Sequence, residues 1–419
     1  MQDNKETSQI FNKFYEVRER TLKIVEPLSV EDMVIQCGYD ASPMRWHLAH
    51  TTWFFEKFLL RKFVQDYTVF DQTFDYLFNS YYETIGRYFP KKLRGTQSRP
   101  IVDRILEYRM KVENDISSHI GDLDGKEALS ILELGINHEE QHQELMLMDI
   151  KYNFFNNPYF PSYNDAKPAR ASKAGKMIYR KHLPGLFEVG YSGKGFSFDN
   201  ETPRHKVWLD SFEIGDRLVT NGEYLEFIED GGYQNPTYWL SDGLEVSRKN
   251  NWKAPLYWVE NENGWKIFTL SGLQDLNPDE PVSHVSFYEA DAYATWAGKR
   301  LPREEEWEVA FSGTRKSTYS NFMDSWYLRP LPVAENDTGS RQALGDLWEW
   351  TKSPYVPYPG SSPLPGSVGE YNHKFMANQM VLRGGSCVTP ADHIRITYRN
   401  FFQPDKRWEF SGIRLAGDA

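Results

Sequence analysis

A change in sequence pattern about a third of the way along the chain constrains the fold more than any other feature. Up to residue 152, apolar residues recur three and four positions apart, as on a buried helix face, in four long segments at 8–25, 43–64, 100–119 and 126–153. A polar connector with helix breakers follows at 156–176. Beyond it the chain has short β-like runs, many Gly and Pro turns, and only two helical segments, at 220–230 and 286–297.

These two patterns predict a mixed fold class, α + α/β. Residues 1–158 are expected to form a four-helix bundle, residues 159–180 a linker, and residues 181–419 an α+β domain rich in loops. The length of 419 residues suits two or three domains and agrees with this division. The sequence makes no prediction about oligomeric state.

Charge and apolar patterning exclude several classes of partner. Lys and Arg number 48 against 59 Asp and Glu, and no basic block occurs, so neither nucleic acid nor an anionic membrane surface is an expected partner. Charged residues interrupt the longest apolar stretches, so no membrane span is expected. The first residues are polar and lack an apolar signal core, which predicts a cytoplasmic protein. Cys37 and Cys387 are too few for a disulfide framework.

Four of the ten histidines fall in two tight groups on predicted helices. His138 and His142 are four residues apart, so both imidazoles can reach one metal ion from the same helix face. His47 and His50 lie near the start of another helix, and one of them is enough to complete a three-nitrogen set inside a bundle. Such a set leaves open positions for O2 and substrate and suits iron, zinc or nickel. The alternative is a structural pair of histidines without a metal.

Longer motifs show a resemblance to a known family. Residues 42–56, SPMRWHLAHTTWFFE, and residues 138–144, HEEQHQE, resemble the two iron-binding segments of the DinB-like bundle in ergothioneine-biosynthesis sulfoxide synthases. The second half resembles the formylglycine-generating-enzyme fold, a C-type-lectin-like fold, in five motifs at 219–224, 281–287, 298–308, 345–350 and 382–386. The resemblance covers nearly the whole chain, and the order of its motifs is highly specific.

The resemblance implies a metal site and a reaction. It implies that His50, His138 and His142 hold Fe(II), with His47 as a structural neighbour. Members of the family use Fe(II) and O2 to join a cysteine sulfur to C2 of the imidazole of hercynine, which is trimethylhistidine, and to oxidise the sulfur to a sulfoxide. Hercynine, cysteine and O2 are therefore the expected small-molecule partners of a hercynine oxygenase.

The resemblance also implies residues that bind the substrates. Gln141 and Asn400 match family residues that hydrogen-bond the acceptor. Aromatic rings attract a quaternary ammonium group, and planar guanidinium groups match a carboxylate. The candidates for these two roles are Phe401 and Phe402 for the ammonium, and Arg94, Arg99 and Arg399 for the carboxylate.

A tyrosine pair is the candidate for the catalytic proton donor. Tyr81 and Tyr82 resemble an adjacent pair in one branch of the family, where a phenol near the iron donates to an oxygen intermediate and favours carbon–sulfur coupling over cysteine dioxygenation. Other members carry this tyrosine in a loop of the second domain, where this chain has Gly366. We therefore expect Tyr82, and after it Tyr81, to act as the donor.

Departures from the family pattern narrow the function. Members that use γ-glutamylcysteine have an acidic residue where this chain has Phe402, so free cysteine is the expected sulfur donor. The second half holds one cysteine, Cys387, whereas sulfatase maturation in this fold needs a pair. The alternatives are an ovothiol-type synthase that uses histidine, a selenoneine-type synthase, and a DinB-like ligand-binding protein that holds zinc. Ovothiol enzymes usually carry a further methyltransferase domain, which is not found before Ala419.

Overall fold

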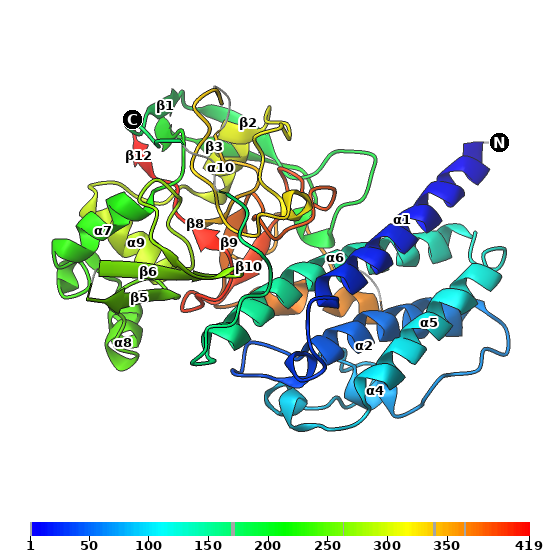
Figure 1. Cartoon of the computed structure of the whole chain (residues 1–419). Helices are drawn as coiled ribbons and strands as arrows, with labels where there is room; N and C mark the ends of the chain where they lie inside the picture. Colours follow the sequence, from blue (N-terminus) through cyan, green and yellow to red (C-terminus); the bar gives the residue numbers. More distant parts are fainter. Residues whose placement is uncertain (1, 169–171, 263, 338–340, 364–365) are drawn as a thin grey trace. The chain divides into compact units, whose positions relative to one another are not determined.

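The computed structural model describes residues 2–168, 172–262, 264–337, 341–363 and 366–419. It divides into two compact units, Met1–Asn164 and Asp165–Ala419. Figure 1 shows helices alone in the first unit and strands mixed with helices in the second. This is the mixed fold class that the change of sequence pattern predicts. None of the helices in the described part of the chain has the length and apolar character that crossing a bilayer demands.

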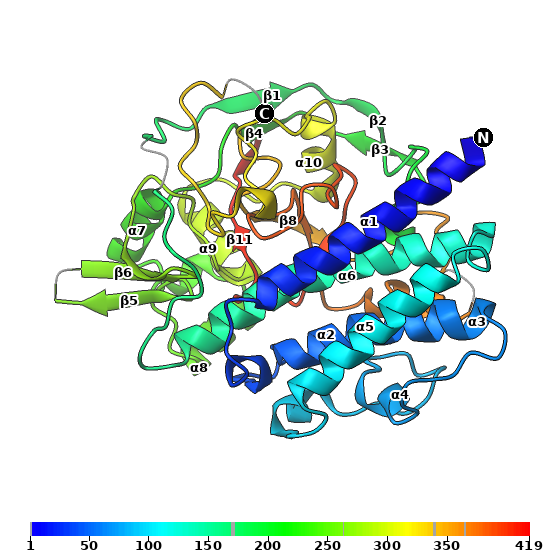
Figure 2. The same ribbon diagram turned by 45° about the vertical axis from the view of Figure 1, so that its right-hand side comes forward.

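Long helices form the first unit, as the apolar spacing predicts. They are α1 (Gln2–Val25), α2 (Met44–Phe55), α5 (Val102–Ser118) and α6 (Lys126–Phe155), with the shorter α3 (Arg61–Phe63) and α4 (Phe74–Leu77) between them. In Figure 2, α1 runs along α6, and α2 packs against both α5 and α6. Every residue of α2 is buried, and most of α6 is buried as well. These two helices therefore form the centre of the bundle.

The segment expected as one helix over 43–64 changes its winding near the middle. After α2 the backbone forms a π-helical turn, Glu56–Leu60, before α3. The turn directs the fully buried Glu56 inward, where its carboxylate accepts hydrogen bonds from the Tyr108 hydroxyl at 2.8 Å and the Phe70 backbone N–H at 2.9 Å. A π-helical turn re-aims side chains and is frequent at functional sites.

A buried charge cluster joins α1 and α5 to α6 one residue after His138. The Glu139 carboxylate accepts from Arg18 at 3.0 Å, Arg109 at 2.8 Å and the Thr21 hydroxyl at 2.6 Å. Burial disfavours the charged carboxylate, but the guanidinium groups of Arg109 and Arg18 outweigh burial and lower the pKa of Glu139 to about 2. The cluster fixes the rotation of α6 and with it the direction of the histidines.

The second unit contains several small sheets, which are mostly antiparallel. The first sheet has the order β1-β4-β12 and the second the order β10-β9-β8-β11, in which β11 and β8 are parallel. The strands of these sheets are β1 (Tyr179–His182), β4 (Phe212–Gly215), β12 (Ala416–Asp418), β8 (Trp348–Pro354), β9 (Met380–Arg383), β10 (Asn400–Phe402) and β11 (Ser411–Gly412). The remaining strands pair as β2-β3 and β5-β6-β7, with bounds β2 (Gly185–Val189), β3 (His205–Leu209), β5 (Trp258–Asn261), β6 (Gly264–Thr269) and β7 (Gly272–Asp275).

Both helices expected in this unit are present, and each begins with a capping box. Thr220 caps α7 (Asn221–Glu229) together with Glu223, and Ser286 caps α9 (Phe287–Trp296) together with Glu289. The expectation of only two helices is wrong, because α8 (Ser241–Lys249) and α10 (Glu304–Phe311) also form. The buried face of α10 carries the carboxylates of Glu304, Glu306 and Glu308, so apolar periodicity does not reveal it.

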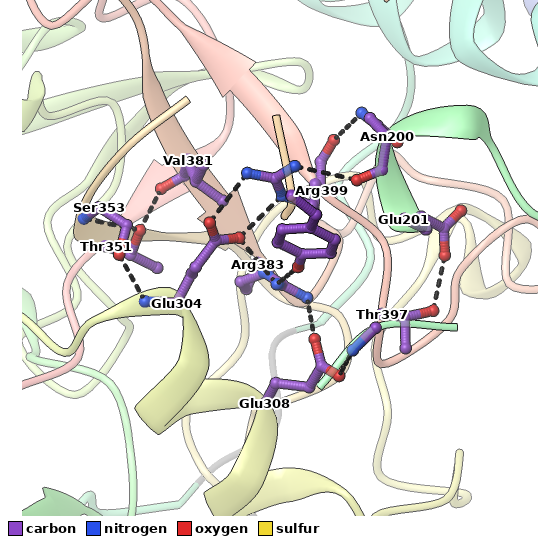
Figure 3. A network of polar contacts seen from close by, with 12 residues as sticks. Asn200, Glu201, Glu304, Glu308, Thr351, Ser353, Val381, Arg383, Thr397 and Arg399 are labelled. Carbon is purple, nitrogen blue, oxygen red and sulfur yellow. Dashed lines mark hydrogen bonds and ion pairs between the residues drawn. The ribbon is translucent and has the colours of Figure 1, made fainter. Parts of the chain in front are cut away.

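Figure 3 shows the polar centre around α10. The Glu304 carboxylate accepts two hydrogen bonds from Arg399, both at 2.9 Å, and one from Arg383 at 2.8 Å. Arg383 also pairs with Glu308 at 3.0 Å. All four side chains are buried, so paired charges replace apolar packing in this part of the core.

Candidate metal centre

Three buried histidines from two helices meet inside the first unit. His50 comes from α2, and His138 and His142 come from successive turns of α6. One nitrogen of each ring can be chosen so that all three lie within 4.8 Å of one another. Nε2 of His50 lies 3.2 Å from Nε2 of His138. The structure thus brings together the three residues that the resemblance implies as ligands.

The geometry of this cluster fits a shared metal ion. The Nδ1–H of His50 donates to the Phe78 carbonyl at 2.6 Å, so in the neutral ring Nε2 presents a lone pair to His138. Imidazole nitrogens bind divalent metals of the zinc type at about 2.0–2.1 Å, so two of them on one ion lie roughly 3.0–3.4 Å apart. The observed 3.2 Å falls in this range.

Burial keeps the cluster neutral, which metal binding requires. Loss of hydration lowers the pKa of His138 to about 3. Burial first, and then the neighbouring imidazoles, also lower the pKa values of His50 and His142 well below the ordinary value. Protons therefore compete weakly for these nitrogens at neutral pH.

Aromatic and polar groups surround the three rings. The Trp46 ring stacks on His50 at 4.6 Å between centroids, and Trp53 stacks on it at 5.8 Å. His47 lies behind His142, with their Nδ1 atoms 2.8 Å apart, as expected of a structural neighbour. Nε2 of His47 lies 3.0 Å from Oδ2 of Asp149. Sequence reasoning missed Asp149, although it lies on α6 about two turns after His142, which places the two on one face.

Arg94 is a buried cation close to this cluster. Its guanidinium carbon lies 3.3 Å from the centroid of the Trp46 ring, and Nη1 donates to the Ser42 hydroxyl at 2.9 Å. Its Nε has no hydrogen-bond partner among the described residues. Burial lowers the pKa of Arg94 to about 9, and its charge in turn lowers the pKa values of His50 and His142. The position suits an anionic ligand.

The other two arginine candidates differ from Arg94. Arg99 is exposed, and its Nη1 donates to the Ser98 carbonyl at 2.8 Å. Arg399 has a different role from the one expected, because its guanidinium group already holds the Glu304 carboxylate and the carbonyls of Asn200 and Val356. Its planar group matches a carboxylate, but that carboxylate belongs to the protein.

The tyrosine pair lies beyond the aromatic residues around His50. Tyr82 is buried, with its ring 6.0 Å from Trp53 and 5.2 Å from Phe58, whereas Tyr81 is half-buried against Tyr82 at 4.6 Å. Trp53 therefore contacts both His50 and Tyr82. Gln141 is half-buried on α6, one residue before His142.

The remaining candidates lie in the second unit. Asn400, Phe401 and Phe402 form β10, and each is half-buried. Phe401 stacks on Tyr355 at 4.0 Å, and Phe402 packs edge-on against Trp408 at 5.1 Å. The Asn400 side-chain oxygen accepts the Phe401 backbone N–H. The segment expected to match the loop tyrosine of other members includes Leu364 and Pro365, which lie outside the described residues.

Comparisons with known proteins identify both units. The model of the DinB superfamily matches residues 13–146, and that of the sulfatase-modifying factor enzyme 1-like domain matches residues 163–419. A hercynine oxygenase of Mycolicibacterium thermoresistibile is 30% identical over 98% of this chain and 95% of the relative. A hercynine oxygenase of Mycobacterium tuberculosis is 33% identical over 96% of each chain.

A third relative covers part of the chain. Ergothioneine biosynthesis protein 1 of Schizosaccharomyces pombe is 28% identical over 52% of this chain and 27% of its own length. The similarity to the two hercynine oxygenases extends through both units. The chain has a DinB-like helical unit and a unit of the sulfatase-modifying factor type, and it is similar to these oxygenases along nearly its full length. The chain therefore belongs to the hercynine oxygenase family.

Proposed function

We propose that this oxygenase is an Fe(II)- and O2-dependent sulfoxide synthase of ergothioneine biosynthesis, which joins the sulfur of cysteine to C2 of the hercynine imidazole. The observation that carries the proposal is the cluster of three buried, neutral imidazoles in a chain of the hercynine oxygenase family. Coupling of a thiol to a C–H bond with sulfoxidation consumes one O2. One oxygen atom enters the sulfoxide, and the other leaves as water with the thiol and C2 hydrogens.

His50, His138 and His142 are the proposed iron ligands. Three neutral nitrogen donors leave further coordination positions for small molecules. When bound, ferrous iron would supply the activation of O2 beside the substrates. The protein contributes rings that are already oriented and a buried, aromatic surrounding that limits access of water.

Arg94 is the preferred partner of a substrate carboxylate. The hydrogen bond of its guanidinium group goes to a hydroxyl, and among the described residues no carboxylate is in hydrogen-bond contact with it. Such a buried cation would bind an anionic ligand strongly, because charge interactions are strong away from water. Arg99 stays a second candidate. Gln141 and Asn400 are proposed to hydrogen-bond the hercynine acceptor, and Phe401 and Phe402 to offer ring faces to its trimethylammonium group.

Tyr82 is the proposed proton donor, with Tyr81 as the alternative. Its phenol ring is held by Phe58 and Trp53, the second of which also contacts His50. A positioned phenol can deliver a proton and so direct the reaction towards carbon–sulfur coupling. Free cysteine is the proposed donor substrate, because Phe402 offers no carboxylate to the ammonium group of a γ-glutamyl donor.

Anaerobic loading with Fe(II), followed by exposure to O2 and substrates, tests the proposal. We expect one iron per chain, O2 uptake, and the sulfoxide of coupled cysteine and hercynine by mass spectrometry. Parallel reactions replace hercynine with histidine, and cysteine with γ-glutamylcysteine or a selenium donor. A preference for one of these would reassign the substrates, whereas stoichiometric zinc without O2 uptake would contradict the oxidative function.

Alanine variants test the ligands in the same assay. His138→Ala or His142→Ala is expected to abolish iron binding and product formation, because each removes one of three donors. His119→Ala is the control, since this histidine lies at the end of α5 and bonds locally to the Asp115 carbonyl. Full iron stoichiometry in either ligand variant would contradict its assignment.

A further inference from the structure

The nitrogen of His142 that faces away from the candidate ligands is part of a buried chain of hydrogen bonds. Its Nδ1 lies 2.8 Å from Nδ1 of His47, and Nε2 of His47 lies 3.0 Å from Oδ2 of Asp149. All three side chains are buried. His47 comes from α2, whereas His142 and Asp149 come from α6. The chain therefore links the two helices that carry the candidate metal ligands.

Donor and acceptor rules fix the direction of these hydrogen bonds. Oδ2 of Asp149 also accepts the backbone N–H of Ser42 at 2.8 Å, so this oxygen acts as an acceptor. The hydrogen between Asp149 and His47 therefore sits on Nε2 of His47. A neutral imidazole has one N–H, so Nδ1 of His47 must accept, and the hydrogen between the two Nδ1 atoms belongs to His142. That leaves Nε2 of His142 with a free lone pair.

We propose that His47 and Asp149 are positioning residues that hold His142 in the tautomer whose Nε2 binds the metal. The inference rests on the metal site of the proposed function. His50 is held in the same tautomer, since its Nδ1–H also donates to an acceptor and leaves Nε2 for the metal, but that acceptor is the backbone carbonyl of Phe78. Acceptors of this kind orient metal-bound histidines and raise their basicity. For His142 the acceptor is a side chain, so substitution can remove it.

Substitutions of His47 and Asp149, with a matched control, test this relay of hydrogen bonds from His142 through His47 to Asp149. His47→Phe keeps an aromatic ring but removes the acceptor, and His47→Gln restores an acceptor oxygen and an amide donor. Asp149→Leu removes the last acceptor, whereas Asp149→Asn keeps an oxygen for His47 and Ser42. Asn153→Leu is the control, because Asn153 also lies on α6 and accepts a backbone N–H of the segment before α2, that of Cys37 at 2.9 Å.

Two measurements avoid any dependence on turnover. Co(II) affinity is measured by competition with a chromophoric chelator, without substrates. Long-range proton–nitrogen NMR of the Zn(II)-loaded protein with 15N-labelled histidine reports which ring nitrogen of His142 carries the hydrogen. Circular dichroism confirms that each variant is folded.

We expect His47→Phe and Asp149→Leu to weaken Co(II) binding by about 10–100-fold, with smaller losses in His47→Gln and Asp149→Asn. Asn153→Leu should bind with wild-type affinity, and His142 of the wild type should show an Nδ1–H. Wild-type affinity in His47→Phe, or an equal loss in Asn153→Leu, would overturn the relay alone. A wild-type protein that binds no Co(II) would overturn the metal site and the relay together.

Discussion

Tyr82 and Tyr81 differ in their surroundings, which makes the proposed proton donor testable. Tyr82→Phe keeps the ring that packs against Phe58 and Trp53 and removes only the hydroxyl. We expect the ratio of sulfoxide to cysteine sulfinic acid to fall by about 100-fold or more, the lower end of the effect of a positioned proton donor. Mass spectrometry of the products gives the ratio.

Tyr81→Phe serves as the matched control, because its side chain is half-buried and contacts the ring of Tyr82. A product ratio that changes in Tyr81→Phe and stays constant in Tyr82→Phe would exchange the roles of the two tyrosines. Thermal unfolding of both variants separates loss of the donor from loss of stability.

Residue patterns predict the three-histidine cluster but not everything around it. The four-residue spacing places His138 and His142 on one face, whereas spacing alone does not decide between His47 and His50. Asp149 contacts His47 of another helix and not His142 itself, so its position two turns after His142 does not by itself reveal its role. Arg399 is a candidate from sequence because its planar guanidinium group matches a carboxylate. Its partner in the structure, Glu304, lies 95 positions away, so no local pattern reveals that the group is already paired.

At the scale of elements, the crossing of α2 and α6 depends on a glycine. A Cβ added to Gly135 would lie 2.4 Å from Cε1 of Phe55, closer than atoms can pack. Because overpacking outweighs the better helix propensity of alanine, we expect Gly135→Ala to destabilise the protein by about 1–3 kcal/mol. The measurement is the free energy of unfolding in urea, and the helical circular dichroism signal monitors the unfolding.

Gly121→Ala is the control for this crossing, since a Cβ there meets nothing within 4 Å. We expect it to unfold at the wild-type urea concentration. Unchanged stability of Gly135→Ala would mean that Phe55 moves away at little cost. Gly135 lies one turn before His138, so the iron affinity of the variant also reports whether the crossing sets the metal geometry.

Elements with a regular apolar face could be predicted, and those with paired charges could not. Helices α5 and α6 match the expected segments closely, and α5 buries one mainly apolar stripe. The segment expected over 43–64 is instead divided by the π-helical turn that follows the fully buried α2. Helix α10 escaped prediction because it buries carboxylates, and the arginines that pair with Glu304 lie 79 and 95 positions away in the sequence. Helix α8 has few apolar residues, and its buried residues are the small Gly243 and Ser247, so apolar periodicity does not reveal it.

At the scale of the whole molecule, the charge cluster of the second unit predicts acid lability. Burial opposes the charge of Glu304, but Arg399 and Arg383 outweigh it and hold its pKa below the ordinary value of 4.5. Its stabilising contribution is therefore complete above about pH 4.5 and is lost as the pH falls through the lower pKa of the folded state. Unfolding followed between pH 3 and pH 7 should show this loss.

Glu304→Gln tests the origin of that pH dependence. The variant leaves the buried Arg399 without a carboxylate and Arg383 with that of Glu308 alone, so we expect a loss of about 3–5 kcal/mol at neutral pH. We also expect stability to fall less steeply with pH below about pH 4.5 than in the wild type. Glu188→Gln is the control, because its pair with Arg204 is exposed and worth little. If the free energy of unfolding falls as steeply at acidic pH in Glu304→Gln as in the wild type, another carboxyl group causes the acid lability.

The proposed ligands join parts of the chain that are distant in sequence, since His50 and His138 are 88 positions apart. An ion held between them acts as a reversible cross-link that closes a long loop. Occupancy by the ion then favours the native bundle by mass action, in proportion to the logarithm of free metal over the dissociation constant. Under the proposed function, iron supply would thus govern the lifetime of the protein as well as its turnover, because chains without the ion would unfold and meet proteases more often.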